Sequence, residues 1–333
     1  MRVPLHRAPR LVWLVAALLF PALGSPRDIA FVPSQVANRV TVIDLDSMQR
    51  LADIPVDGKP AGVAIAQQAG RAYVTSPEGK FVTIIDTALR VVVGQIEVGG
   101  GPLGIAVHPS GAPVYVADWY QHRVYAVDPL RRLVTGFATV GQSPSGLAIS
   151  SDGRTLLSAD RDDDQVSIID TATFTVRSVV KVGTRPFGVT LSADGARAYT
   201  ANVGSNDVTV IDVARAEVIG TVKVGKRPYA VALANGRVFV SDQYAATVSV
   251  FDTATLANLA TIAVGDYPEG IAAAADGRSV LVVNWESNTV QRIDAETLKV
   301  TGSAEAADGP RGFGQFIWRQ PFPNGCLAAS CLD

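Results

Sequence analysis

The residue types best suited to binding or chemistry lie in short, dissimilar segments that each follow a strand-like run. One segment is aromatic, from Trp119 to His122, and the next is charged, from Asp160 to Asp164. The full set of candidates is Trp119, Tyr120, His122, Asp160, Arg161, Asp162, Arg185, Arg227, Tyr244, Trp285 and Glu286. Because Trp, Tyr and Arg commonly anchor interfaces, this set favours recognition of a ligand or a protein partner.

Catalytic and metal-binding motifs are absent from the sequence. There is no Gly-x-Ser-x-Gly, no phosphate-binding glycine loop and no Cys-x-x-Cys. His108 and His122 follow different strands of their repeat and are expected on opposite rims, which argues against a metal site shared by the two. We therefore expect no catalytic residue, no metal and no cofactor.

Three of the candidate groups also have a purely structural interpretation, and the sequence leaves both interpretations open. The segment from Arg161 to Asp164 fits a solvated loop as well as a binding loop. Trp119 and Trp285 could pack on adjacent repeats instead of binding a ligand. Asp160 and Asp162 could form ion pairs with Arg185, and such pairs contribute little when exposed.

The sequence contains a repeat of about 42 residues, and this repeat indicates the fold that positions these side chains. Two independent series of residues keep the same step, and repeats of ~40–45 residues with several short strands are typical of propeller blades. The marker prolines are Pro60, Pro102, Pro144, Pro186, Pro228, Pro268 and Pro310. The aspartates that end a strand-like run are Asp44, Asp86, Asp128, Asp170, Asp212, Asp252 and Asp294.

One repeat shows four strands, which we name A to D from the innermost to the outermost. The expected strands are 187–191, 198–201, 208–212 and 217–224. The one shorter step in the proline series arises where Asn235-Gly236 replaces a longer A–B turn, and Asn-Gly is the preferred two-residue hairpin connection. Helices should be minor, since no sustained helical periodicity follows the N-terminal segment.

The repeat count also predicts how the ring closes. Residues 29–34 align with a second strand, so the first repeat lacks its innermost strand, and residues 312–317 form an innermost strand without a repeat of its own. Pairing the two would remove exposed sheet edges. We expect an all-β, seven-bladed β-propeller of four-stranded antiparallel blades over residues 25–319, closed by its C-terminal strand and followed by a tail, 320–333.

This architecture assigns a structural task to the repeated residues and a functional one to the variable residues. The seven aspartates are expected to accept backbone N–H bonds in the C–D turns. In such blades the B–C and D–A loops emerge on one face. All the candidate residues fall in or next to these loops, where Lys59, Tyr267 and Arg311 join them.

The N-terminal segment has the pattern of an export signal. Three arginines precede the apolar run Leu11–Phe20, and Ala22-Leu23-Gly24 offers small residues for cleavage, so residues 1–24 are predicted to be a signal peptide. Removal leaves 26 basic and 31 acidic residues, a net charge of about −5. We expect a monomer that is periplasmic or secreted, without affinity for duplex nucleic acid or, after cleavage, membranes.

The tail contains the two cysteines of the chain. Cys326 and Cys331 are close in sequence, and an oxidising compartment favours a local disulfide between them, although free thiols remain the alternative. The sequence does not choose between the two states.

Short motifs within the repeats support a family resemblance. Tyr73-Val-Thr-Ser, Tyr115-Val-Ala-Asp and Tyr199-Thr-Ala-Asn, with Val-x-Val-Ile-Asp and Val-Gly-x-x-Pro-x-Gly elements, resemble the YVTN family of β-propeller repeats over about residues 29–317. The chain is also similar to exported seven-repeat propellers associated with PQQ-dependent alcohol catabolism and, more distantly, to the heavy chain of methylamine dehydrogenase. The resemblance implies a propeller fold and an accessory role beside such an oxidation system.

Three functions compete on these observations. The first is a non-enzymatic periplasmic binding or scaffold propeller that takes a protein partner or a small-molecule ligand. The second is an enzyme or enzyme subunit, either a lactonase-like hydrolase or a dehydrogenase heavy chain, which requires Asp160, Asp162 or Glu286 to converge on one pocket. The third is single-stranded nucleic-acid binding through stacked Trp119, Tyr120, Tyr244 and Trp285, which the negative net charge opposes.

Overall fold

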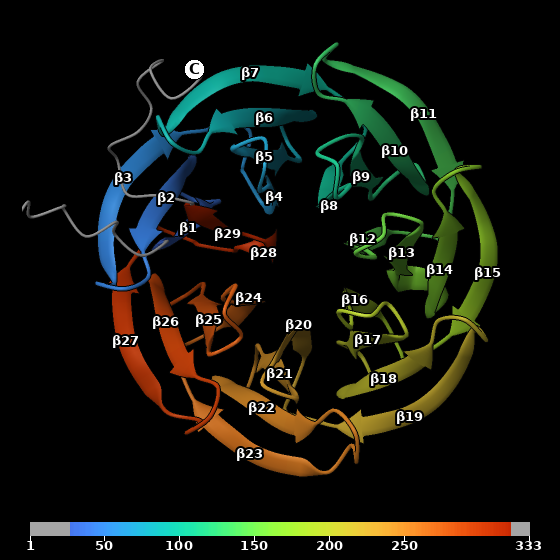
Figure 1. Ribbon diagram of the computed structural model, residues 1–333, viewed down its shortest axis with the longest axis vertical. Helices are drawn as coiled ribbons and strands as arrows, with labels where there is room; N and C mark the ends of the chain where they lie inside the picture. Colours follow the sequence, from blue (N-terminus) through green and yellow to red (C-terminus); the bar gives the residue numbers. More distant parts are fainter. Residues whose placement is uncertain (1–26, 321–333) are drawn as a thin grey trace, which may run out of the picture.

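Seven β-sheets stand like blades around a central channel (Figure 1). The computed structural model describes residues 27–320, so the predicted signal peptide and Cys326 and Cys331 lie outside the described residues. Within 27–320 the only helical segment is a short 3-10 turn, η1, Arg161–Asp163. No helix in that range is long and apolar enough to span a membrane.

Each blade has four antiparallel strands, to which blade 2 adds a short fifth strand in parallel, and successive blades follow one another in sequence order around the ring. The predicted seven-bladed, all-β architecture is therefore confirmed. Blade 1 contains β1 (Arg27–Ser34), β2 (Arg39–Asp44) and β3 (Gln49–Pro55), with β29 (Ile317–Gln320) as its innermost strand. Blades 2 and 3 comprise β4 (Gly62–Ala66), β5 (Arg71–Ser76), β6 (Phe81–Asp86), β7 (Val91–Glu97), β8 (Pro102–Val107), β9 (Val114–Asp118), β10 (Arg123–Asp128) and β11 (Leu133–Thr139).

The remaining four blades repeat this order. Blades 4 and 5 comprise β12 (Pro144–Ile149), β13 (Thr155–Asp160), β14 (Gln165–Asp170), β15 (Thr175–Lys181), β16 (Pro186–Leu191), β17 (Arg197–Asn202), β18 (Asp207–Asp212) and β19 (Glu217–Lys223). Blades 6 and 7 comprise β20 (Pro228–Ala234), β21 (Arg237–Asp242), β22 (Thr247–Asp252), β23 (Asn258–Ala263), β24 (Pro268–Ala273), β25 (Ser279–Asn284), β26 (Thr289–Asp294) and β27 (Val300–Glu305).

The apolar core lies between neighbouring blades. Strands B and C are apolar on both faces, as in β17 and β18, because blades pack against them from both sides, whereas the outer strand β19 is mostly exposed. Tyr199 and Phe251 are typical of this core: they belong to blades 5 and 6 and pack with ring centroids 6.5 Å apart. Burial between layers, not local propensity, therefore holds the strands in place.

The local turn predictions are confirmed. Each of the seven repeat aspartates accepts backbone N–H bonds from residues two or three positions later, as Asp294 does from Glu296 and Thr297. Asn235 and Gly236 both adopt positive φ, 48° and 68°, in the two-residue A–B hairpin of blade 6. These positive angles are those of the turn that Asn-Gly favours.

A glycine lies two residues after most marker prolines, and close contact with the next blade requires it. A Cβ at Gly146 would lie 2.5 Å from the carbonyl oxygen of Phe187, and one at Gly188 would lie 2.6 Å from that of Tyr229. Both contacts are with the backbone of the next blade. The innermost strands therefore approach so closely around the channel that a side chain is excluded there.

Ring closure differs in register from the prediction. Only β29 completes blade 1, pairing Ile317 with Ala30 and Gln320 with Arg27. Residues 313–315 form β28 (Phe313–Gln315), which instead pairs in parallel with β4, the innermost strand of blade 2. Figure 1 shows β28 at the end of the chain's path, reaching into the channel. Closure of blade 1 by the C-terminal strand is therefore confirmed, but the predicted bounds of that strand, 312–317, are wrong, because residues 313–315 pair with blade 2.

The cause of this departure is the Phe313 side chain together with its two flanking glycines. Phe313 is buried against the rings of Phe187 and Tyr229, with ring centroids 5.1 and 5.6 Å away. Gly312 and Gly314 adopt φ of 55° and 115°, which lets the chain cross the channel before it returns to blade 1. This aromatic contact across the ring thus determines where β29, the strand that completes blade 1, begins.

The closure predicts that Gly314→Ala destabilises the protein strongly. At φ 115° a Cβ is strained, and it would meet the carbonyl oxygen of Val63. We expect the free energy of unfolding in urea to fall by roughly 2 kcal/mol or more.

Gly136→Ala is the matched control, because its Cβ would meet nothing within 4 Å and its φ is not in the left-handed region. We expect it to change the unfolding free energy by less than about 0.5 kcal/mol. Equal effects of the two variants would contradict the proposed role of β28.

Candidate functional site

The B–C and D–A connections form one face of the propeller, which we call the loop face. Each B–C loop is tied by a backbone hydrogen bond to the D–A connection beside it, as from Val203 N to Arg185 O and from Gln243 N to Arg227 O, both 3.0 Å. The A–B and C–D turns form the opposite turn face. All eleven predicted candidates lie in or beside loops of the loop face, as expected.

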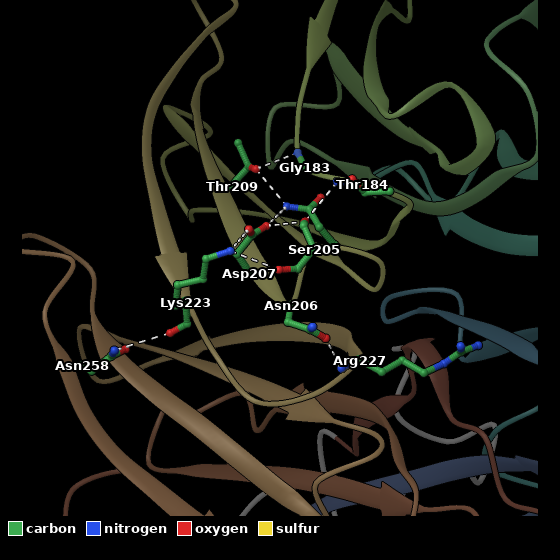
Figure 2. Close-up of polar contacts among 10 residues, drawn as sticks. Gly183, Thr184, Ser205, Asn206, Asp207, Thr209, Lys223, Arg227 and Asn258 are labelled. Atoms are coloured by element: carbon green, nitrogen blue, oxygen red, sulfur yellow. Dashed lines mark hydrogen bonds and ion pairs between the residues drawn. The ribbon is translucent and has the colours of Figure 1, made fainter.

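A buried polar side chain ends the B strand of every blade, and we call these seven residues the strand-end column. Its members are Ser34, Ser76, Asp118, Asp160, Asn202, Asp242 and Asn284, and each is fully buried. In blade 5 the amide of Asn202 donates to Asp207 and Thr209, both at 2.9 Å. Ser205 and Lys223 also bond Asp207, so one network joins the B–C loop to strand D (Figure 2).

Asp160 belongs to this column, so its task is structural. Its carboxylate accepts hydrogen bonds from the hydroxyls of Ser158 and Ser167 and from the backbone N–H of Gly141. Burial raises the pKa of Asp160. A Cβ at Gly141 would touch Asp160, which explains the glycine of the Val-Gly-x-x-Pro element.

The predicted ion pairs of Asp160 and Asp162 with Arg185 are not formed. Asp162 instead pairs with Arg161 at 2.5 Å and accepts a hydrogen bond from Ser143 Oγ at 2.6 Å. Arg185 is exposed, and its side chain makes no hydrogen bond or ion pair with any residue in 27–320. The charged segment after β13 is therefore a well-bonded loop that leaves Arg185 available.

His122 also has a structural position. It occupies the last residue of its B–C loop at φ 55°, and its Nδ1 accepts a hydrogen bond from Ser143 N at 3.4 Å. Asp164 and Asn206 hold the equivalent position in the next two blades. Their side-chain oxygens accept hydrogen bonds from the backbone N–H groups of Arg185 and Arg227, both at 2.7 Å. Figure 2 shows the Asn206 contact. Each loop thus fixes the connection that enters the next blade.

Four aromatic rings close the channel at the loop face. Phe187 lies at the centre, with ring centroids 4.3 Å from Tyr229, 5.1 Å from Phe313 and 6.1 Å from Trp119. Trp119 therefore packs on a residue from another blade, and it also carries the guanidinium of Arg161 5.6 Å above its ring. Below these rings the channel contains a cavity of ≈ 290 Å³, lined mainly by aliphatic residues of the innermost strands and by Phe313.

A buried ion pair lies beside the aromatic rings. Glu269 bonds Arg311 Nε at 2.8 Å and accepts from Gln243 Nε2 at 2.7 Å. Arg311 also donates to the hydroxyl of Tyr229 at 2.5 Å, and burial raises the pKa of that hydroxyl. Charge and hydrogen bonds are mutually satisfied here, which a buried pair requires. This ion pair therefore supports the mouth of the channel instead of offering free groups to a ligand.

A second row of side chains extends outward from Gln243. Arg227 donates from Nε to Gln243 Oε1 at 2.6 Å and lies 4.8 Å over the ring of Tyr244. Tyr244 contacts Tyr267, and Tyr267 contacts Trp285, with ring centroids 5.4 and 5.8 Å apart. The structure thus brings together three of the predicted residues, Arg227, Tyr244 and Trp285, on neighbouring loops.

Of the other predicted candidates, Glu286 borders this row, because it lines a hollow that Tyr244 and Tyr267 also line, whereas Tyr120 lies elsewhere on the loop face. Tyr120 is 71% exposed and covers Gly101. Glu286 is exposed and lines an open hollow of ≈ 530 Å³ together with Lys226, Asp266 and Tyr267. Asp160, Asp162 and Glu286 therefore do not converge on one pocket, which the enzyme hypothesis requires.

Of the residues that immediately follow the marker prolines, sequence reasoning placed only Arg311 beside the candidates and missed the others. This position holds Ala61, Leu103, Ser145, Phe187, Tyr229, Glu269 and Arg311. Four of these, Phe187, Tyr229, Glu269 and Arg311, form the centre of the mouth. The sequence did contain a signal for this position. It changes from Ala, Leu and Ser to aromatic and charged residues, while the residue before it is always proline and the residue after it is glycine in six of the seven repeats.

The arrangement offers aromatic rings and guanidinium groups, which suit recognition. Within residues 27–320, no group of three or more His, Cys, Asp or Glu side chains is placed to hold a metal ion.

Comparisons with known proteins agree with the fold. Residues 11–113 match the model of the YNCE-like β-propeller family. The chain is similar to Kuenenia stuttgartiensis hydrazine synthase, with 19% identity and a TM-score of 0.73 over 86% of this chain and 99% of that one. It is equally similar to a functionally unknown protein from Desulfotomaculum acetoxidans DSM 771, with 19% identity and a TM-score of 0.74 over 86% and 98% of the chains. No curated protein matches the sequence.

The strand-end column predicts that Asp242→Asn stabilises the protein at neutral pH. Burial raises the pKa of Asp242 to about 6, although the hydroxyls of Ser249 and Thr247 donate to the carboxylate. Because the folded carboxyl binds a proton more tightly than the unfolded one, its contribution to stability is lost as pH rises from about 4 through 6. Asn occupies the same column at Asn202 and Asn284 and carries no charge.

We expect the variant to exceed the wild type by roughly 1–3 kcal/mol in urea unfolding at pH 7.5, with the difference shrinking at pH 4.5. Asp252→Asn is the control, and its expected effect on stability has the opposite sign, because N–H donation by Thr255 lowers the pKa of Asp252. It should be less stable than wild type at neutral pH, and that loss should diminish as the pH falls below 4. A pH-independent difference for Asp242→Asn would refute the assignment.

Proposed function

We propose that this protein is a non-enzymatic, exported binding propeller whose loop face recognises a partner. The observation that carries the proposal is the continuous set of contacts from Trp119 through Phe187, Tyr229, Arg311, Glu269, Gln243, Arg227, Tyr244 and Tyr267 to Trp285. Its inner members, Phe187, Tyr229, Glu269 and Gln243, are buried and support accessible aromatic and arginine side chains on neighbouring loops, the types that anchor interfaces.

The separation of structural residues from variable residues within the repeat supports a binding function. Buried or turn-forming carboxylates such as Asp160 and Asp294 hold the scaffold, while the residues that vary between blades gather at the mouth. A rigid scaffold that presents variable loops is a common basis for recognition. Nucleic-acid stacking has less support, because Trp119 packs inward on Phe187, away from the Tyr244–Tyr267–Trp285 row.

The proposal also includes a location outside the cytoplasm and a class of partner. The charged and apolar pattern of residues 1–24 supports a periplasmic or secreted location. The similarity to exported seven-repeat propellers of PQQ-dependent alcohol catabolism supports a partner from such an oxidation system. This part of the proposal rests on the resemblance alone.

The test is affinity capture from a periplasmic extract with the wild-type protein and with Tyr244→Ala and Trp285→Ala. Truncating an interface anchor commonly costs 2 kcal/mol or more, so we expect each variant to retain less than about a tenth of the partner. Quantitative mass spectrometry of the bound fraction provides the measurement. A captured quinone-cofactor dehydrogenase would support the narrower proposal.

Leu130→Ala is the matched control, because Leu130 is 91% exposed in a C–D turn of the opposite face. It should capture the partner as the wild type does. Turnover of an alcohol or lactone by the purified protein alone, or equal losses in all three variants, would contradict the proposal.

A further inference from the structure

We infer that the loop face binds an acidic segment of a protein partner, with Arg185 and Arg227 as the residues that bind its carboxylates. This inference rests on the proposed function and specifies the chemistry of its partner. Both arginines immediately precede a marker proline, in the connections that enter blades 5 and 6. They flank the aromatic pair Phe187 and Tyr229 in adjacent blades.

Arg227 is positioned before any ligand arrives. Its Nε is held by Gln243, its plane lies over Tyr244, and its backbone N–H is capped by Asn206. Figure 2 shows the side chain extending away from the Asn206 contact, so that its guanidinium end lies apart from the polar network. Both terminal nitrogens lack a partner among residues 27–320, although five guanidinium donors favour carboxylates in a fork geometry.

Arg185 repeats the same backbone arrangement one blade earlier. The φ values of Arg185 and Arg227 are 56° and 54°, and each N–H is capped by the last residue of the preceding B–C loop. Its side chain is exposed and makes no hydrogen bond or ion pair with the described residues. Two adjacent blades thus present one uncompensated guanidinium each.

Among the arginines at the mouth, Arg185 and Arg227 are the two that no carboxylate of the described residues neutralises, and Lys226 beside Arg227 adds a further exposed cation. Arg161 is neutralised by Asp162, and Arg311 by Glu269. Asp163 and Asp164 each accept a backbone N–H bond, from Gln142 and Arg185. Asp266 and Glu286 line the hollow beside Tyr244, so the acidic residues of the bound segment should lie toward Arg185 and its apolar residues toward the aromatic row.

The shape of the surface favours a protein segment over a small molecule. Small ligands are usually enclosed by a concave pocket, whereas the arginines lie on an open mouth whose aromatic floor is already packed. The aromatic row from Tyr244 to Trp285 extends the contact surface over blades 6 and 7. An extended chain that carries two or more Asp or Glu residues would contact both features.

The test measures fluorescence anisotropy of a labelled peptide of alternating glutamate and phenylalanine residues, with the glutamine analogue as the neutral probe. We expect the wild type to bind the acidic peptide at least 10-fold more tightly than the neutral one. Arg185→Gln and Arg227→Gln should each weaken binding about 10-fold and reduce its dependence on salt. Equal binding of the two peptides would overturn the inference.

Arg131→Gln is the matched control, because Arg131 is an exposed arginine in a C–D turn of the turn face. It should bind the acidic peptide as the wild type does, and a loss equal to that of the Arg185 and Arg227 variants would overturn the inference. Thermal unfolding of all variants checks that the propeller remains folded. Free glutarate that binds as tightly as the peptide, with the same arginine dependence, would show a small-molecule site and overturn the choice of a protein segment.

The capture experiment separates the two proposals. If the partner is lost in Trp285→Ala but retained in Arg185→Gln and Arg227→Gln, the loop face binds a partner and the acidic-segment inference fails. If all four loop-face variants retain it, the proposed function fails as well.

Discussion

The burial of one polar side chain at the end of every B strand is the constraint on which the loop face depends. A buried polar group is costly unless it is hydrogen-bonded, so blades 3 to 7 supply partners for their carboxylate or amide, whereas the smaller hydroxyls of Ser34 and Ser76 have none among the described residues. Asp160 meets this demand with Ser158, Ser167 and the N–H of Gly141. The same bonds that satisfy the side chain therefore fix the path of the loops that carry the candidate residues.

The loops in turn fix one another around the ring. Asp164 and Asn206 end their B–C loops in the left-handed region and cap the connections into the next blade. Arg185 and Arg227 consequently start from rigid backbone positions, although their side chains are surface groups. A cation on such a support loses less conformational freedom when it binds than one on a mobile loop.

Sequence patterns predicted the elements whose causes are local. The turn aspartates and the Asn235-Gly236 hairpin depend on residues only two or three positions away, and both have the expected geometry. The register of closure was not predictable in this way, because it depends on Phe313 meeting Phe187 and Tyr229 from two other blades. The ion pair of Glu269 with Arg311 was missed for the same reason: the two residues are 42 positions apart and meet only when the ring closes.

The repeat therefore separates what holds the ring from what distinguishes one blade from another. Glycines at positions 146 and 188 allow neighbouring backbones to touch, and they leave the preceding residue, just after each marker proline, at the mouth of the channel. That position accepts Ser145 in one blade and Phe187 in the next, because the backbone around it is already fixed. Variation at this position of the repeat can alter the chemistry of the mouth while the blade geometry stays the same, which is how a regular scaffold acquires an asymmetric mouth.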